Sequence, residues 1–470
     1  MHKQILTALT LAFTIHAASL FAREIPIAVP SDLNLLNTAL PGDVFTLKNG
    51  VWTDAHINIK KGGSAESPLV IRAETPGQVV LNGSSSLEFN APHATVEGLL
   101  FSKGAIKGGA VIAFKSDHGT LRNTAVVDYN PAKFETRYYW VYFHGNNNLV
   151  DHCYFKGKNH DDPLIGNHWD GSEHNTVSAS YIKDIPYVNA NGREDFRIWG
   201  YGRDNELGEG GAFFTIKGNL LDHADGEGEE VISLKSNRNR VIRNTILATR
   251  GGINLRAGNF NTVQDNIILG KGVPGSSGIR MSGQNLVIKD NYVSGCEFGI
   301  RVSCGEYIEK NLTGKYVACL RKRPLPQIAI PAYGQVKNLM LSGNVLVGIK
   351  EADLDFGARY KVHWPKSQNI LLPESCQIEN NRFIRPKGGV SVTGALPDTD
   401  KDPVVPRLTY QPNKFAGNVV EGGEVNFVPA KSGFTVKQLP LGWTEAREVA
   451  KYKPLTSSDV GPDWARNKGL

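Results

Sequence analysis

The segments VIRNTIL at 241–247, TVQDNII at 262–268 and VIKDNYV at 287–293 are copies of one unit, in which apolar residues flank a polar turn that ends in Asn. The leading apolar residue of this unit recurs at Val96, Leu121, Val150, Val177, Ile216, Val241, Val263, Ile288, Leu341 and Ile378. Most steps between these positions are 22–29 residues long, which is typical of one coil of a solenoid, and the step of 53 residues would then be two coils.

A second series of apolar residues runs in parallel with the first. Its members are Ile232, Ile253, Ile279 and Ile300, at steps of 21, 26 and 21 residues. Each coil therefore repeats at least two short strands. We predict an all-β fold, a single-stranded right-handed parallel β-helix in which every strand pairs with its equivalent one coil above. The Leu-x-x-Leu-x-Leu pattern of leucine-rich repeats, the competing solenoid, is absent.

Asn occupies the fourth position of many units, at Asn219, Asn244, Asn266, Asn291, Asn344 and Asn381. Asn tolerates the left-handed backbone conformation, and its side chain readily bonds to nearby backbone. We therefore expect these residues to form tight corners in that conformation.

The two ends of the chain differ from the repeat. The segment 31–40 has Leu residues at a helical period, and we expect a capping helix there, within an N-terminal cap at about 31–50, because a solenoid end exposes apolar surface and unpaired strands. The repeat fades after about residue 385, which predicts an irregular tail at 385–470 with a short surface helix at 444–453. Residues 23–470 are predicted to form a single domain.

The N-terminus predicts export. Lys3 precedes an apolar stretch from Ile5 to Phe21 that ends in small residues, which is typical of a signal peptide at 1–22 cleaved near Ala22. A membrane anchor is the alternative, although this apolar run is short for a span. We expect a secreted or periplasmic protein with no membrane insertion.

The composition is that of an ordinary globular chain. Its 470 residues include 52 basic and 46 acidic side chains, for a net charge of +6, which excludes collagen, a coiled coil and a disordered chain. Basic and acidic side chains are present in similar numbers, so a mixed surface is expected and no nucleic-acid partner. Its cysteines lack CxxC spacing and are expected as buried thiols, with at most one bridge among the middle three: Cys153, Cys296, Cys304, Cys319 and Cys376.

Lys235 and Arg256 are the candidate chemical groups. Residues one and three positions after an inward Ile point outward on the same face of a strand. The third position holds Lys235, Arg256, Ser282 and Ser303, and the first holds Ser233, Asn254, Arg280 and Arg301. Two cations would then lie on successive coils with no carboxylate at their level, which disfavours the protonated form of the lysine. Such a pair suits removal of a proton α to a carboxylate, as in β-elimination of a uronate. The alternative is a pair of solvated surface cations.

The remaining cations, acids and aromatic residues extend this picture. The arginines at 256, 280 and 301 would repel one another unless a polyanion lay across them, so Arg280, Arg301, Asn254 and Tyr201 are candidate substrate-binding residues. Aromatic and His-rich segments at 138–144, 160–169 and 199–201 could extend the cleft by stacking on sugar rings. An acidic turn with Glu227, Glu229 and Glu230 could bind calcium, or could be a solvated loop.

With these residues in hand, the chain resembles polysaccharide lyase family six, which contains alginate lyases and chondroitinase B. The segments that carry the resemblance span the mature chain: PGDVFTLKNGVW at 41–52, VDHCYFKGK at 150–158, NGREDFRIWG at 191–200, DGEGEEVISLKS at 225–236, GINLRAGN at 252–259, SGIRM at 277–281 and LTSSDVGPDW at 455–464. The resemblance implies a right-handed parallel β-helix and places the family's catalytic lysine and arginine at Lys235 and Arg256.

The resemblance also implies calcium, held by an Asn in an NGGE-like segment and by two glutamates before the lysine. Asn191 matches the first ligand. The acidic turn is one residue longer than in the family, so the second carboxylate beside Glu227 is either Glu229 or Glu230. Without calcium, Arg280 is the alternative group to neutralise the substrate. No organic cofactor is expected.

The substrate implied by the resemblance is an anionic polysaccharide. Alginate is preferred, dermatan sulfate is the alternative within the same reaction, and a non-catalytic polyanion-binding β-helix is the alternative of another class. A glycosidase would need two facing carboxylates, whereas the glutamates at 227–230 lie on one turn. The oligomeric state cannot be read from the sequence.

Overall fold

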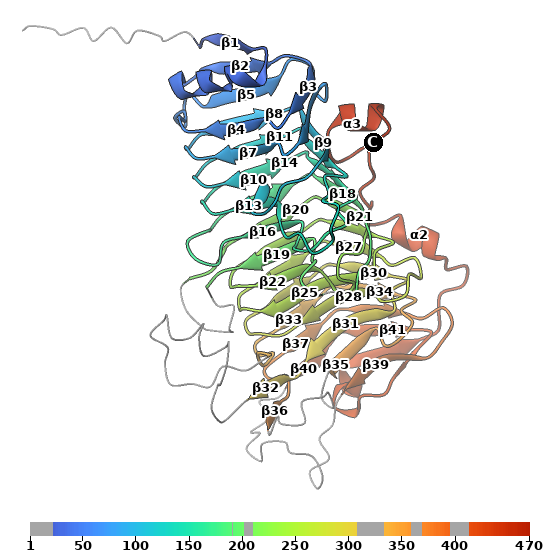
Figure 1. Ribbon diagram of the computed structural model, residues 1–470. Helices are drawn as coiled ribbons and strands as arrows, with labels where there is room; N and C mark the ends of the chain where they lie inside the picture. The colour runs from blue at the N-terminus through green and yellow to red at the C-terminus, as the bar shows by residue number, and fades with distance from the viewer. Residues whose placement is uncertain (1–21, 190, 202–209, 308–332, 359–368, 395–412) are drawn as a thin grey trace, which may run out of the picture.

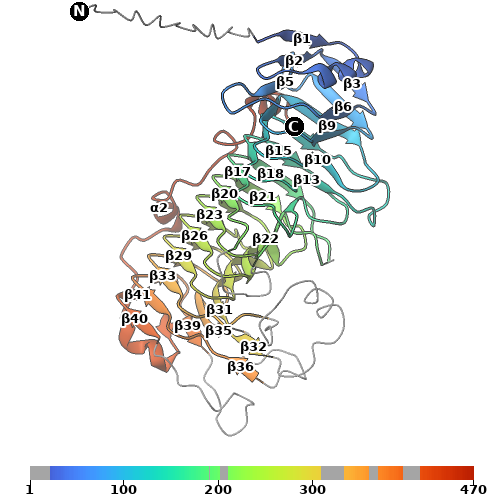
Figure 2. The ribbon, with the colours of Figure 1, turned by 90° about the vertical axis from the view of Figure 1, so that its left-hand side faces the viewer.

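A computed structural model describes residues 22–189, 191–201, 210–307, 333–358, 369–394 and 413–470. Within these residues the chain winds through three long parallel sheets, here called sheets A, B and C, which have 14, 14 and 13 strands. Figures 1 and 2 show the coils stacked as one elongated solenoid, from β1 at one end to β39 and β41 near the other. The predicted parallel β-helix is confirmed.

Each coil contributes one short strand to each sheet. Sheet A contains β1 (Glu24–Ile27), β2 (Val44–Leu47), β5 (Leu69–Ala73), β8 (Ala94–Glu97), β11 (Thr120–Arg122), β14 (Leu149–Asp151), β17 (Thr176–Ser178), β20 (Thr215–Lys217), β23 (Arg240–Ile242), β26 (Thr262–Gln264), β29 (Val287–Lys289), β33 (Met340–Ser342), β37 (Gln377–Glu379) and β40 (Lys414–Ala416). Sheet B contains β3 (Gly50–Thr53), β6 (Val79–Gly83), β9 (Leu99–Gly104), β12 (Ala125–Val127), β15 (Tyr154–Lys156), β18 (Tyr181–Ile185), β21 (Leu220–Ala224), β24 (Thr245–Leu247), β27 (Ile267–Leu269), β30 (Tyr292–Ser294), β34 (Val345–Val347), β38 (Arg382–Ile384), β41 (Asn418–Glu421) and β43 (Phe434–Lys437).

Sheet C carries the candidate chemical groups. It contains β4 (His56–Ile59), β7 (Ser86–Phe89), β10 (Ala110–Phe114), β13 (Tyr139–Phe143), β16 (Ile165–Asn167), β19 (Phe196–Trp199), β22 (Glu230–Lys235), β25 (Gly251–Ala257), β28 (Ser276–Met281), β31 (Phe298–Ser303), β35 (Leu354–Ala358), β39 (Val390–Gly394) and β42 (Glu424–Val425). A separate antiparallel pair joins β32 (Gly305–Tyr307) to β36 (Asn369–Leu371).

The core is built from equivalent residues of successive coils. The four isoleucines of the second series align in register on β22, β25, β28 and β31, and all are buried, as predicted. Nearer the N-terminus, the rings of Phe89, Phe114 and Phe143 stack along the same axis, with centroids 4.4 and 4.8 Å apart. Parallel pairing in register therefore brings like side chains together through the whole interior.

The Asn residues of the repeat form a buried ladder rather than the corner itself. The side-chain amide of Asn244 donates to Oδ1 of Asn266 at 2.9 Å, and the Asn266 amide donates to Oδ1 of Asn291 at 2.9 Å. The expected left-handed conformation is wrong for these residues, because it belongs to the residue before each one, such as Arg243 and Asp265. The preceding residue makes the turn, and this leaves each Asn side chain free to point inward.

Two expectations about coil count are also wrong. Ile288 pairs directly with Leu341, so the step of 53 residues is one coil with a long insertion and not two coils. The repeat also continues past residue 385, because β40 to β43 extend all three sheets to Lys437. The number of residues between repeats includes the loops, so a long loop within one coil can be mistaken for an additional coil.

Both ends of the solenoid are covered. A 3-10 helix, η1 (Pro30–Thr38), lies in the predicted N-terminal cap, buries Leu36 and contacts β1 and β4. A second 3-10 helix, η2 (Val428–Gly433), contacts β40 at the other end. The predicted surface helix in the tail is confirmed as α2 (Glu445–Val449), and α3 (Asp463–Asn467) follows it.

The C-terminal tail runs back along the solenoid beside sheet B, as Figure 1 shows. The Leu455 N–H donates to Thr245 Oγ1, the Gly461 N–H donates to the Ala179 carbonyl, and the Trp464 indole donates to the Asn123 carbonyl. Val460 and Ala465 pack with buried residues of β9, β12, β15, β18 and β21. The tail therefore binds coils that are far apart along the axis.

The predicted signal peptide lies almost wholly outside the described residues. Among the helices that are described, none is long and apolar enough to cross a membrane. The side chains of four cysteines are buried, as expected for most of them: Cys153, Cys296, Cys304 and Cys376. Cys319 lies outside the described residues.

The Asn ladder should contribute measurably to stability. Asn266→Ala removes the oxygen that accepts both the backbone N–H and the side-chain amide of Asn244, at 3.0 and 2.9 Å. Because both donors are buried, we expect the free energy of unfolding to fall by at least about 2 kcal/mol, measured by urea denaturation. Asn34→Ala, at an exposed site in η1, is the control and should change it by less than about 0.5 kcal/mol. Equal free energies of unfolding for the two variants would contradict the claim that the Asn ladder stabilises the fold.

Candidate functional site

Lys235 and Arg256 lie on neighbouring strands of sheet C, at the C-terminal ends of β22 and β25. Their side chains are 16% and 26% exposed. Ser233 and Leu234 pair with Asn254 and Leu255, but the register then shifts and places Lys235 opposite Ala257. The two cations are therefore on successive coils as predicted, although they are offset by one residue along the strands.

The expectation that no carboxylate lies at this level is wrong. Glu194 Oε1 lies 2.8 Å from Lys235 Nζ, and Glu230 lies 3.9 Å from both Lys235 Nζ and Arg256 Nε. Glu194 precedes β19 on the coil before, and Glu230 begins β22 itself. These two side chains do not occupy the two outward positions that follow each inward Ile, because Glu194 comes from a loop and Glu230 from the first residue of its strand.

Three carboxylates meet beside Lys235. Those of Glu194, Glu227 and Glu230 each offer an oxygen within 4.8 Å of the others. Burial, followed by the neighbouring charge of Glu194, raises the pKa of Glu227 to about 7, although the Gly192 N–H donates to it at 2.6 Å. Burial opposes ionisation of Glu194, but Lys235 and Arg197 hold its pKa below the ordinary value. Glu194 is therefore ionised and paired with cations, whereas the buried environment of Glu227 disfavours its charged form.

Glu229 points away from this cluster. Its side chain is 73% exposed and accepts from Arg280 Nη1 at 3.0 Å, whereas Arg280 Nη2 donates to the buried Glu230 at 2.9 Å. Arg280 Nε also donates to Oδ1 of Asn254 at 3.2 Å. The spacing left Glu229 and Glu230 as alternative neighbours of Glu227. In the structure Glu230 lies beside Glu227.

The prediction that the arginines of this face would repel one another without a bound polyanion is wrong for Arg280. Arg280 is 9% exposed and is neutralised by glutamates of the same chain, so no polyanion is needed to hold it. Arg301 pairs in register with Arg280, donates to Ser277 Oγ at 3.2 Å and lies over the Phe298 ring. Arg280 thus fixes the carboxylates of the cluster, and Arg301 lies one coil further along the sheet.

Aromatic rings cover both candidate cations. Lys235 Nζ lies 5.1 Å from the Trp199 ring centroid, and the Arg256 guanidinium lies 3.9 Å from that of Tyr333. Tyr201 is half-buried, and its backbone carbonyl accepts from the Asn237 N–H. Rings at these positions could stack on a sugar that approaches the two cations.

Sequence reasoning missed three of these residues. Glu194 ends the NGRE segment at 191–194, so the same segment that supplied Asn191 contained the signal for it. Asn191 itself is exposed, next to the glycine that donates to Glu227. Arg197 pairs with Glu194 at 2.6 Å, and Tyr333 follows a long insertion where the spacing gave no register.

The chain matches the family model described as Chondroitinase B over residues 31–461. It belongs to the chondroitinase B family. This lyase is 40% identical to the PL6 family polysaccharide lyase of Pseudopedobacter saltans, with a TM-score of 0.81 over 94% of this chain and 99% of that one. The expected membership of polysaccharide lyase family six, and with it the expected lyase activity, is therefore confirmed. No curated protein matches the chain.

Two further solved structures show the same fold as this lyase. The PL6 family alginate lyase AlyGC is 24% identical, with a TM-score of 0.76 over 94% of this chain and 58% of that one. A mannuronic acid specific family 6 lyase from human gut microbiota is 22% identical, with a TM-score of 0.74 over 95% of this chain and 97% of that one. These likenesses extend along nearly the whole described solenoid.

The two glutamate partners of Arg280 should contribute unequally to the free energy of unfolding of this lyase. Arg280→Leu leaves the buried Glu230 without its closest cation, and we expect the free energy of unfolding to fall by about 3 kcal/mol. Glu229→Gln removes only the exposed partner and should cost less than about 1 kcal/mol. Urea denaturation measures both variants. A larger loss for Glu229→Gln than for Arg280→Leu would contradict the assignment of Glu230 as the principal partner.

Proposed function

We propose that this lyase cleaves alginate by β-elimination, with Lys235 as the base and Arg256 as the acid. The observation that carries the proposal is the position of both cations 3.9 Å from one buried carboxylate, Glu230, on adjacent strands of sheet C. A base and an acid must approach one sugar linkage together, and a shared carboxylate holds the two side chains near each other. Family membership supplies the reaction class.

In the proposed reaction, the Lys235 lone pair takes the proton from C5 of a uronate. The electrons of that C–H bond form the C4=C5 double bond, and the C4–O4 bond breaks with its electron pair on O4. Arg256 stabilises the departing O4 and supplies its proton, so the products are one saturated end and one unsaturated sugar. Glu194, which is 2.8 Å from Nζ, positions the Lys235 amine, and the Trp199 ring centroid lies 5.1 Å from the same atom.

The carboxylate of the uronate must be neutralised before its α-proton becomes acidic enough for a lysine. Three carboxylates whose oxygens lie within 4.8 Å of one another are a donor set that calcium prefers, and a bound cation would favour the ionised form of Glu227. We propose Glu194, Glu227 and Glu230 as calcium ligands, with the backbone near Asn191 beside them. When bound, calcium would supply the positive charge that the substrate carboxylate needs. Because Arg280 is held by two glutamates, it is the less favourable neutraliser.

Alginate is proposed over dermatan sulfate within this reaction class. AlyGC is an alginate lyase of the PL6 family, and a mannuronic acid specific lyase shares the fold. Dermatan sulfate remains the second candidate because the matching family model is described as Chondroitinase B. An extracellular polymer also suits the proposed export of the chain to the periplasm or medium, with cleavage near Ala22, which N-terminal sequencing of the mature protein would check.

Substitution of either proposed group should abolish turnover of alginate. We expect Lys235→Ala and Arg256→Ala to lower kcat by about 10²- to 10⁴-fold, as for a lost base or acid. The measurement is the ultraviolet absorbance of the unsaturated product. Lys217→Ala and Arg240→Ala remove exposed cations from sheet A, outside the site, and should leave the rate unchanged.

The same assay on a panel of polymers tests the substrate. Alginate, its two homopolymeric blocks, dermatan sulfate and pectate are compared at equal mass concentration. Faster cleavage of dermatan sulfate than of alginate would contradict the proposed preference. Normal product absorbance from Lys235→Ala would contradict the proposed base.

Calcium should bind and stabilise the protein if the three glutamates are its ligands. We expect calcium to raise the Tm of the EDTA-treated protein and to restore its activity, because a ligand that binds only the folded state stabilises it. Glu227→Gln removes a ligand and should lose the Tm shift, whereas Glu229→Gln should retain it. Full activity after exhaustive chelation, together with no Tm shift, would contradict the metal site.

A further inference from the structure

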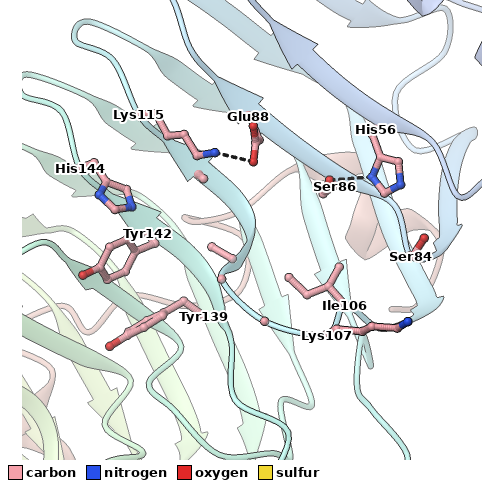
Figure 3. A pocket seen from close by; sticks show the side chains of 14 residues that line it. His56, Ser84, Ser86, Glu88, Ile106, Lys107, Lys115, Tyr139, Tyr142 and His144 are labelled. Carbon is pink, nitrogen blue, oxygen red and sulfur yellow. Dashed lines mark hydrogen bonds and ion pairs between the residues drawn. The ribbon is translucent and has the colours of Figure 1, made fainter.

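A pocket of about 650 Å³ opens on the outer face of sheet C, on the N-terminal side of the site. It is lined from β4, β7, β10 and β13, and it contains neither Lys235 nor Arg256. Figure 3 shows Tyr139, Tyr142 and His144 along one side and His56 on the other, with Lys115 between them. The pocket and the proposed active site are therefore separate hollows on one sheet face.

A small side chain creates the pocket. Glu88, Ala113 and Tyr142 pair in register on β7, β10 and β13, so their side chains form one outward row. Ala113 fills little of its place in that row, between a glutamate and a tyrosine. Gly108 and Gly109, just before β10, add no side chains at the adjacent edge. The gap therefore results from the small residues Gly108, Gly109 and Ala113.

The lining carries the groups that a uronate needs. Lys115 and the exposed Lys107 supply positive charge, and Lys115 is 42% exposed although it also pairs with Glu88 at 2.7 Å. Burial opposes ionisation of Glu88, but the hydrogen bonds from Lys115 and Asn90 keep its pKa below the ordinary value. The rings of Tyr139 and Tyr142 lie 4.5 Å apart between centroids. Cations bind sugar carboxylates, and tyrosine rings stack on sugar faces.

The pocket joins the active site through one row of equivalent positions. The His144 N–H donates to the carbonyl of Phe114, the residue before Lys115, and the His168 N–H donates to the carbonyl of Phe143, the residue before His144. Lys115, His144 and His168 are therefore equivalent positions, each directly after the end of its strand, β10, β13 or β16. Trp199 and Lys235 pair in register on the next two strands of the sheet.

This row is a path for an extended chain. The His144 and His168 rings stack with centroids 5.3 Å apart, and His168 lies beside Trp169 at 5.8 Å. Four strand steps separate β10 from β22, which at about 4.8 Å per step is roughly 19 Å. The rings of His144, His168 and Trp199 lie along that interval.

We propose that this pocket is a second binding site for the uronate polymer, occupied by a remote part of the same chain whose linkage lies at Lys235. The chemical identity of the polymer rests on the proposed function, but the existence of the site does not. Two contacts on one chain raise the effective concentration of the polymer at the active site. The pocket therefore favours long chains over short ones.

The test is to fill the pocket and compare long with short substrates. Ala113→Trp places a large ring in the gap, and Lys115→Glu reverses its charge. For both variants we expect KM for polymeric alginate to rise at least about tenfold with kcat unchanged. KM for an alginate trisaccharide, which is too short to reach from the active site, should not change. Lys217→Glu, on sheet A, is the charge-matched control and should behave as wild type.

The outcomes separate this inference from the proposed function. Unchanged KM for the polymer in Ala113→Trp, or an equal rise for polymer and trisaccharide, would overturn the second site. If the wild type cleaves no alginate, the proposed substrate fails, and the pocket is then tested with whichever uronate polymer of the panel is cleaved. Binding of the Lys235→Ala protein to that immobilised polymer should weaken when Ala113→Trp is added, and unaltered binding would overturn the site independently of turnover.

Discussion

Parallel pairing between equivalent residues of successive coils is the constraint on which this molecule depends. Once one coil is in register with the next, each side chain has its counterpart roughly 4.8 Å away along the axis. The interior benefits, because isoleucines, phenylalanines and asparagines stack on their own kind. The outer face of sheet C inherits the same order, so that Lys235 and Arg256 stand on adjacent strands, while Glu194 and Glu227 reach them from the loops before β19 and β22.

The sequence predicted the features that recur and missed those that do not. The isoleucine series identified sheet C and, through it, Lys235 and Arg256, because period-two alternation and a fixed coil length are both visible in one chain. Glu194 comes from a loop and Tyr333 from the end of a long insertion. Because such segments have no fixed length, their sequence positions do not predict which coil they lie beside. The same limit explains the insertion after Ile288, which spacing alone cannot tell from a complete coil.

The sequence suggests a positively charged site, but the cations of the folded site are paired with buried glutamates. Read along the strands, the face carries lysine and arginines, yet in three dimensions each of Lys235, Arg197 and Arg280 is matched by a buried glutamate. Such pairing fixes long side chains that would otherwise lose conformational entropy on binding substrate. The carboxylate left with the least compensation is Glu227, and the charge balance of the site therefore depends on what is bound beside it.

The returning C-terminal tail changes how a solenoid of this kind can come apart. In an ideal repeat protein each coil touches only its neighbours, so unfolding can begin at either end and proceed coil by coil. Here the tail binds early coils, with Lys468 donating to the Gly77 carbonyl and Tyr154 donating to the carbonyl of Leu470. The tail thus acts as a longitudinal brace between distant coils, and the early coils gain these contacts only once the later coils have been synthesised and the tail can fold back.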